Sequence, residues 1–129
     1  YLRAYLLRDL RLNIPIRDHT ASQELIDAGF FKTDSRPVKK LSHLLTNCIG
    51  GVDPGVLVDI EQLTLAHGDR ILLCTDGLTD VVADTEILRT LDDSSDPNAA
   101  CRTLVDLALE RGGPDNITVV VGRYVLPAG

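Results

Sequence analysis

Residues 71–80 read ILLCTDGLTD, and the apolar run in this stretch stops abruptly at an Asp-Gly pair. The run 71–74 is short and continuously apolar, which is typical of a central strand that is covered on both faces. Gly77 lets the backbone bend sharply directly after the acidic residue. The stretch therefore predicts a buried strand that delivers the carboxylate of Asp76 into water at the edge of a sheet.

A second acidic motif precedes the last strand that the sequence predicts. Residues 112–116 read GGPDN, and the β-branched run 117–121 that follows predicts another buried strand, with a flank that reaches Val125. If the two strands are antiparallel neighbours, Asp76 and Asp115 emerge at the same end of the sheet.

Two carboxylates held close together repel each other unless a divalent cation binds them or one pKa rises. Oxygen ligands favour Mg²⁺, Mn²⁺ or Ca²⁺, and neither motif offers histidine or a ligating cysteine for zinc. We therefore expect Asp76 and Asp115 to be metal ligands. Gly77 and Asn116 would shape the loops around them, the asparagine by tying its loop to backbone groups through its amide. Either motif alone is more often a simple turn, but the two together favour a site.

The composition limits the classes of partner. The chain has 129 residues, is 44% hydrophobic and 25% charged, and carries a formal net charge of -6, which argues against nucleic-acid binding. The sequence has no apolar tract long enough to cross a bilayer, so we expect no membrane partner. Cys48, Cys74 and Cys101 are odd in number and widely spaced, which indicates buried thiols in the cytoplasm rather than a disulfide framework. A strand is expected directly at Tyr1, so we expect the natural chain to continue upstream.

Four more strands are expected from alternation and from turn residues. They lie at 2–7 and 10–14, joined as a hairpin at Arg8-Asp9, and at 43–48 and 56–65.

Three helices are expected from capping residues and apolar spacing. The first spans 21–28, and the second is short and capped by Asp84. The third begins at Asp96-Pro97 and stops at the glycines 112–113. Its apolar face is formed by Cys101, Leu104, Val105 and Ala108.

Around these residues the sequence resembles the PPM-type (type 2C) metal-dependent serine/threonine protein phosphatases, especially the bacterial ones. The resemblance rests on GDRILLCTDGLTDVV at 68–82 and GGPDNITVVV at 112–121. Three shorter matches support it, namely RAYLLRD at 3–9, RDHT at 17–20 and LLTNCIGG at 44–51. It implies an α+β fold, part of an α-β-β-α sandwich of antiparallel sheets flanked by helices.

The resemblance also implies a function. Residues 1–129 would be the C-terminal portion of a phosphatase domain that hydrolyses phosphoserine or phosphothreonine in proteins by a metal-bridged water. Its cofactor would be Mg²⁺ or Mn²⁺, with two or more ions in the complete domain and with Asp76 and Asp115 among their ligands. The family's upstream acidic motifs are not in this sequence, so the missing N-terminal half is needed for a complete site. We expect this fragment alone to be inactive.

Two other classes of protein with an acidic loop motif do not match these residues. In a haloacid-dehalogenase-type phosphatase the nucleophilic aspartate stands two positions before the motif, where this chain has Cys74. An EF-hand loop from Asp76 would need glycine and glutamate where Val81 and Ile87 stand. A noncatalytic, pseudophosphatase-like regulatory or interaction module remains open, and the upstream sequence would distinguish it from the enzyme.

Overall fold

The computed structural model describes residues 2–15 and 60–128. The helix expected at 21–28 and the strand expected at 43–48 lie outside these residues. All elements named below belong to the compact unit formed by Tyr1–Ile16 and Glu61–Gly129. Within the described residues, none of the helices is both long enough and apolar enough to cross a bilayer.

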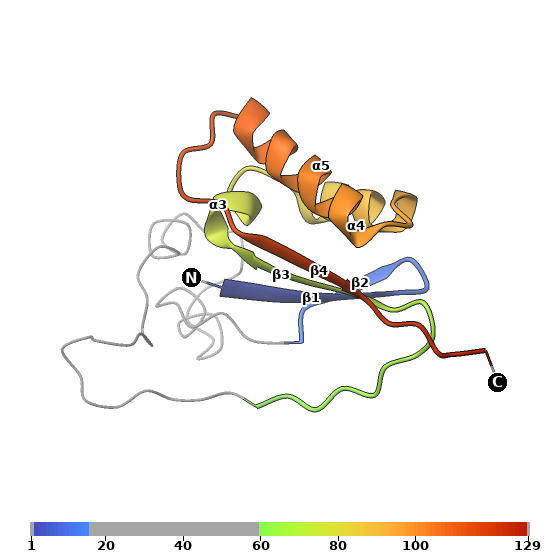
Figure 1. The fold of residues 1–129 in the computed structure, drawn as a ribbon. Coiled ribbons are helices and arrows are strands. Elements are labelled where there is room, and N and C mark those ends of the chain that lie inside the picture. Colours follow the sequence, from blue (N-terminus) through green and yellow to red (C-terminus); the bar gives the residue numbers. More distant parts are fainter. Residues whose placement is uncertain (1, 16–59, 129) are drawn as a thin grey trace. The chain divides into compact units, whose positions relative to one another are not determined.

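The described strands form one antiparallel sheet in the order β2-β1-β3-β4 (Figure 1). Their bounds are Leu2–Arg8 for β1, Arg11–Asn13 for β2, Arg70–Thr75 for β3 and Val119–Arg123 for β4. In the register, Leu72 of β3 lies opposite both Tyr5 of β1 and Val121 of β4. The antiparallel pairing of β3 with β4, on which the proposed meeting of the two acidic motifs depends, is therefore confirmed.

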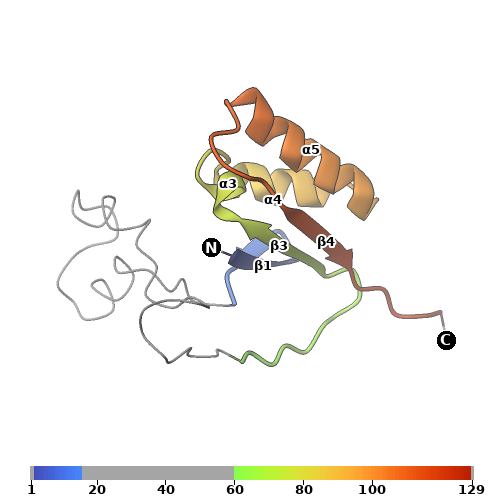
Figure 2. The ribbon, with the colours of Figure 1, turned by 60° about the vertical axis from the view of Figure 1, so that its left-hand side comes forward.

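Three helices follow β3 along the chain, and they lie on one face of the sheet (Figures 1 and 2). Their bounds are Asp76–Thr79 for α3, Asp84–Asp93 for α4 and Pro97–Glu110 for α5. The described part thus combines an antiparallel sheet with helices, as the predicted α+β class requires.

The core lies between the sheet and the helices. Alternate strand residues point to the same face, so Tyr5 and Leu72 both reach the helix side, where each has no exposed surface. Ile87 and Leu91 of α4 and Leu104 of α5 are equally buried against them. Burial of each of these aliphatic side chains contributes about 1.5–3 kcal/mol.

The first hairpin is confirmed, with its turn one residue later than expected. Asp9 and Leu10 form the turn, with φ angles of 48° and 58°. Positive φ at both central residues is the geometry that fits the twist of a two-residue hairpin. The usual Asn-Gly signal is absent, which explains why the sequence placed the break at Arg8-Asp9.

The helix α5 begins and ends as predicted. Asp96 Oδ1 accepts a hydrogen bond from Asn98 N at 3.1 Å, and Pro97 occupies the first turn. At the other end Gly113 N donates to Ala108 O at 3.1 Å. The buried face differs from the prediction, because it is formed by Ala100, Leu104 and Ala108, while Cys101 and Val105 are only partly buried.

The cap of α4 was predicted wrongly. Ala83 is the N-cap and Asp84 is already the first helical residue. Glu86 Oε2 accepts from Ala83 N at 3.2 Å, so the side chain of Glu86 satisfies the helix start. Asp84 Oδ1 instead accepts a hydrogen bond from the Tyr5 hydroxyl at 2.9 Å and joins α4 to β1. Burial of the ring is the main cause that raises the pKa of Tyr5.

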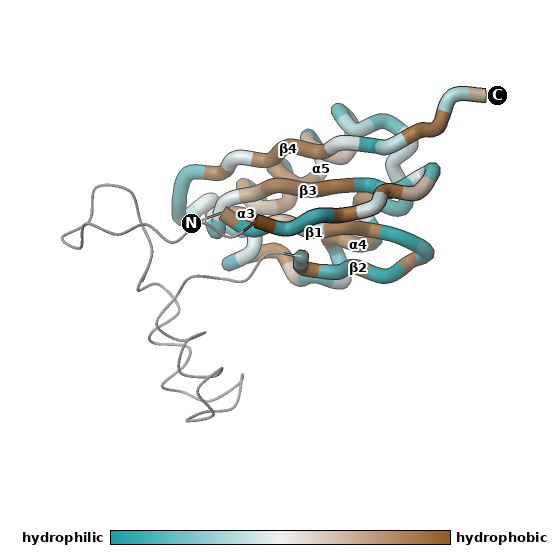
Figure 3. Tube along the Cα trace, turned by 90° about the horizontal axis from the view of Figure 1, so that it is seen from below, coloured by the Kyte–Doolittle hydropathy of each residue, from teal (hydrophilic) through white to brown (hydrophobic). Residues whose placement is uncertain are grey.

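Two expectations about burial and one about a strand were wrong. Leu73 is 36% exposed and Val120 is 55% exposed, because the helices cover only one face of the sheet in the described residues. Seen from the side away from the helices, β3 and β4 are largely hydrophobic (Figure 3). The expected strand at 56–65 has no regular structure over residues 60–65, and residues 56–59 lie outside the described part.

An ion pair between the partly exposed Arg8 and the buried Asp69 joins the end of β1 to the start of β3, and the sequence did not reveal it. Asp69 is only 2% exposed, and its Oδ1 accepts from Arg8 Nε at 2.9 Å. Ala66 N donates to Asp69 Oδ2 at 2.8 Å. The hydrogen bonds from Arg8 are the main cause that lowers the pKa of Asp69, so its charge is retained despite burial.

Candidate metal site

Asp76 stands where β3 becomes α3. Thr75 is the last residue of the strand and the N-cap of the helix, with extended φ and ψ of -84° and 165°. The chain therefore turns from strand to helix between these two residues, and Asp76 lies in the first helical turn, partly buried. Its backbone carbonyl accepts from Asp80 N at 2.8 Å, which fixes the main chain at this position.

Gly77 is buried because the loop of the second motif lies directly against it. A Cβ built on Gly77 would lie 2.2 Å from the carbonyl oxygen of Asn116 and 3.0 Å from its carbonyl carbon. Real Cβ atoms do not approach backbone so closely, so only glycine allows this contact. The expected reason for a glycine was a sharp bend, whereas the structure shows a helical residue that needs room for a neighbouring segment.

Asp115 lies in the exposed loop between α5 and β4. Its Oδ1 accepts a hydrogen bond from Asn116 N at 2.7 Å, so the carboxylate is held by the backbone of the next residue. The carbonyl of Asn116 accepts a further bond from the Thr75 hydroxyl at 3.2 Å. Asn116 thus supports the loop through its backbone, and the role expected for its side-chain amide stays a prediction.

The hydroxyl of Thr75 joins the two motifs, a role that was not predicted from the sequence. It donates to Asn116 O at 3.2 Å and accepts from Thr118 N at 3.0 Å. The backbone continues the contact, because Thr75 N donates to Thr118 O at 3.1 Å. The sequence signal that could have indicated this role is a threonine placed between an apolar strand and an Asp-Gly pair.

These bonds bring the segments that carry Asp76 and Asp115 to the same end of the sheet. Thr75 and Asn116 are joined by a hydrogen bond. Asp76 directly follows Thr75 in the chain, and Asp115 directly precedes Asn116. Within residues 2–15 and 60–128, no three acidic, histidine or cysteine side chains form a group that could hold a metal ion. Two carboxylates suit a hard divalent cation but supply only part of its six to eight ligands.

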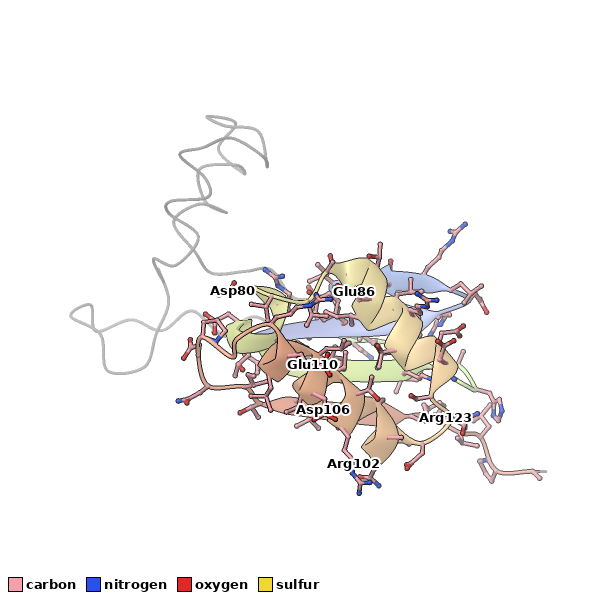
Figure 4. All side chains as sticks on the ribbon, turned by 90° about the horizontal axis from the view of Figure 1, so that it is seen from above. Asp80, Glu86, Arg102, Asp106, Glu110 and Arg123 are labelled. Atoms are coloured by element: carbon pink, nitrogen blue, oxygen red, sulfur yellow. The ribbon has the colours of Figure 1, made fainter. Side chains whose placement is uncertain are left out.

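Arg111, directly after α5, forms an ion pair with Glu86 of α4 and also bonds the chain between α3 and α4. Arg111 Nη1 donates to Val81 O at 2.6 Å and to Glu86 Oε2 at 2.8 Å. The hydrogen bonds that Glu86 accepts from Arg111, followed by the one from Ala83 N, lower the pKa of Glu86 to about 2. The loop that carries Asp115 leaves α5 at Arg111, so the ion pair of Arg111 with Glu86 fixes one end of that loop. Glu86 is labelled in Figure 4.

Comparisons with known proteins give the family and the fold of this chain. The family model described as Stage II sporulation protein E (SpoIIE) matches residues 32–125. The serine/threonine protein phosphatase PstP of Mycobacterium tuberculosis is 37% identical over 123 residues, which are 95% of this chain and 23% of PstP.

Two solved structures have the same fold. PppA, a key regulatory component of the T6SS in Pseudomonas aeruginosa, is 36% identical with a TM-score of 0.80, over 95% of this chain and 49% of PppA. The catalytic domain of the serine/threonine protein phosphatase PstP in complex with two manganese ions is 37% identical with a TM-score of 0.76, over 96% of this chain and 50% of that domain.

The chain thus spans about half of each matched structure and less than a quarter of the full PstP sequence. The family model covers most of the chain, and the matched proteins share its fold. This chain therefore belongs to the SpoIIE-related family of PPM-type (type 2C) serine/threonine protein phosphatases.

Proposed function

We propose that residues 1–129 form the C-terminal portion of a metal-dependent phosphatase domain, in which Asp76 and Asp115 bind Mg²⁺ or Mn²⁺. The proposal rests on one observation above all, the hydrogen-bonded contact of Thr75 with Asn116 and Thr118. This contact joins two motifs that are far apart in the sequence. The manganese complex of the related PstP catalytic domain supports the choice of cation.

The chemistry of the two carboxylates suits a hard cation. Each ionised carboxylate offers about four lone-pair sites, and Asn116 N occupies one site on Asp115. The remaining sites of an exposed Asp115 and a partly buried Asp76 are suited to a cation. When bound, Mg²⁺ or Mn²⁺ would activate a water for attack on phosphorus and would neutralise charge on the phosphoryl oxygens.

The substrate would be phosphoserine or phosphothreonine in a protein, as the family membership suggests. In this proposal the residues of this chain hold the cation and set the distance between the two carboxylates. The part of the parent domain outside these residues would supply the further ligands. The isolated chain would therefore have negligible turnover.

The test uses the intact parent protein and a phosphothreonine peptide in the presence of Mn²⁺. Asp76→Asn and Asp115→Asn remove one charge each, and Asp115→Asn keeps an oxygen that can accept from Asn116 N. We expect both to weaken Mn²⁺ binding, measured by calorimetry, by more than the roughly 10–100-fold that the loss of an outer-shell partner costs. Turnover should fall in parallel while thermal unfolding of the metal-free protein changes little.

Asp106→Asn is the matched control, because Asp106 lies on the outward side of α5 (Figure 4). It should bind Mn²⁺ and turn over substrate as the wild type does. Wild-type turnover in Asp115→Asn would overturn the assignment of that ligand. A folded parent protein that binds Mn²⁺ and hydrolyses no phosphopeptide would favour the noncatalytic module instead.

A further inference from the structure

We propose that Thr75 is a positioning residue that couples the two metal-binding carboxylates, and this inference rests on the proposed function. Thr75 itself would not contact the cation or the substrate. Its hydroxyl would set the separation of Asp76 and Asp115 by holding their two segments together.

The first step concerns the strand-to-helix change at Thr75. In an antiparallel ladder, two opposite residues of a hydrogen-bonded pair exchange both N–H···O=C bonds. Thr75 N donates to Thr118 O at 3.1 Å, so one of the two bonds is present. The return bond from Thr118 N goes to Thr75 Oγ1 at 3.0 Å instead of to the carbonyl of Thr75.

This replacement has a physical reason. Thr75 is the N-cap of α3, and an N-cap carbonyl is turned into the helix, where it accepts the first helical bond. The ladder therefore needs another acceptor for Thr118 N, and the hydroxyl provides it. A side chain without a hydroxyl would leave Thr118 N without this acceptor just where the two motifs meet.

The second step concerns the proton of the same hydroxyl. A hydroxyl has one donor and two acceptor positions, and Thr75 uses the donor on Asn116 O at 3.2 Å. The backbone of Asn116 is thereby held between the hydroxyl on one side and Asp115 on the other, because Asn116 N donates to Asp115 Oδ1 at 2.7 Å. A continuous series of hydrogen bonds therefore runs from Thr118 through Thr75 and Asn116 to the Asp115 carboxylate.

The third step links this series to Asp76. Asp76 directly follows Thr75 in the chain, and Gly77 packs against the same Asn116 carbonyl. Movement of the Asn116 peptide would therefore change the position of one carboxylate relative to the other. Metal affinity depends steeply on such distances, and loss of a partner that orients a ligand costs roughly 10–100-fold in affinity.

The experiment compares three variants of the intact parent protein. Thr75→Val keeps the shape and removes the hydroxyl, Thr75→Ser keeps the hydroxyl, and Thr103→Val removes a hydroxyl that bonds Ala99 O at 3.0 Å on α5, away from the site. Mn²⁺ affinity is measured by calorimetry, and kcat and KM with a phosphothreonine peptide.

We expect Thr75→Val to bind Mn²⁺ about 10–100-fold more weakly, with turnover restored by excess Mn²⁺ and KM for the peptide little changed. Thr75→Ser and Thr103→Val should bind Mn²⁺ as the wild type does. Wild-type Mn²⁺ affinity in a folded Thr75→Val protein would overturn the proposal, as would equal losses in Thr75→Ser and Thr75→Val.

A measurement on the wild-type parent keeps the proposal testable if Thr75→Val does not fold. Because coupling between two sites is reciprocal, Mn²⁺ should slow hydrogen exchange of the Thr118 amide. The amide of Val105, within α5, is the internal control and should change less. Unchanged exchange at Thr118 on saturation with Mn²⁺ would refute the coupling. A parent protein that binds no Mn²⁺ would overturn the proposed function and, with it, this inference.

Discussion

At the residue scale, the tightest requirement of the site is the absence of a side chain at Gly77. A Cβ there would lie 2.2 Å from Asn116 O, and the obstacle is backbone rather than a flexible side chain. We predict that Gly77→Ala displaces the Asn116 peptide and lowers stability by about 1–3 kcal/mol, the usual cost of overpacking. Mn²⁺ binding to the parent protein should weaken as well, since Asp115 is attached to that peptide. Thermal unfolding and calorimetry measure the two effects.

Gly122 is the matched control for this change. It lies in β4 with no atom within 4 Å of a built Cβ, so Gly122→Ala should leave both stability and Mn²⁺ affinity close to wild type. Gly77→Ala with wild-type values for both quantities would show that the two loops do not approach each other as closely as described. The sequence predicted only a bend at Gly77. The contact with Asn116 could not be predicted, because Asn116 lies far along the chain.

At the scale of elements, local sequence signals predicted the bounds of a helix well. They did not predict which face of the sheet is covered by other parts of the chain. The helix α5 was found from Asp96, Pro97 and the following glycines, all of which act on the nearest turn of backbone. The exposure of Val120 was missed, because β-branched sequence is equally compatible with a buried strand and with one open face. The meeting of the segments that carry Asp76 and Asp115 could be predicted from the sequence, since each residue adjoins a predicted strand. The hydrogen bonds of Thr75 could not be predicted, because they depend on the register between β3 and β4.

The connection between α4 and α5 gives a prediction about pH. Glu86 has a pKa of about 2 in the folded chain, below its usual 4.5, chiefly because of its hydrogen bonds with Arg111. A carboxyl with a lowered folded-state pKa contributes stability that is fully present above pH 4.5 and is lost as the pH falls towards 2. We predict that Glu86→Gln lowers the Tm of the metal-free parent protein at pH 7 and that the difference shrinks as the pH falls through this window.

Thermal unfolding at several pH values between 7 and about 2 measures this difference. Asp106→Asn, which also removes one carboxylate but lies on the outward side of α5, should follow the wild-type curve. A difference between Glu86→Gln and wild type that stays constant as the pH falls would assign its effect to packing rather than to the charge of Glu86.

At the scale of the whole molecule, the sheet face away from the helices has an apolar surface. Val120 lies opposite Leu73, and the row that they form continues to Ala4 of β1, which is buried. Leu73 and Val120 are 36% and 55% exposed. The resemblance to an α-β-β-α sandwich implies that another part of the parent domain covers this row.

This arrangement predicts opposite behaviour for two apolar residues of similar exposure. Leu109, on α5, is 58% exposed, and Val120 is 55% exposed. If the parent domain covers the open face, Val120→Glu in the intact parent places an unpaired charge in a buried layer. It should then lower stability by at least the roughly 1–3 kcal/mol that burial of an unpaired polar group costs. Leu109→Glu should change the Tm little, because the outer surface of α5 remains in contact with water. Equal Tm values for the two variants would show that nothing in the parent packs over Val120, and the chain would then not be half of a two-sheet domain.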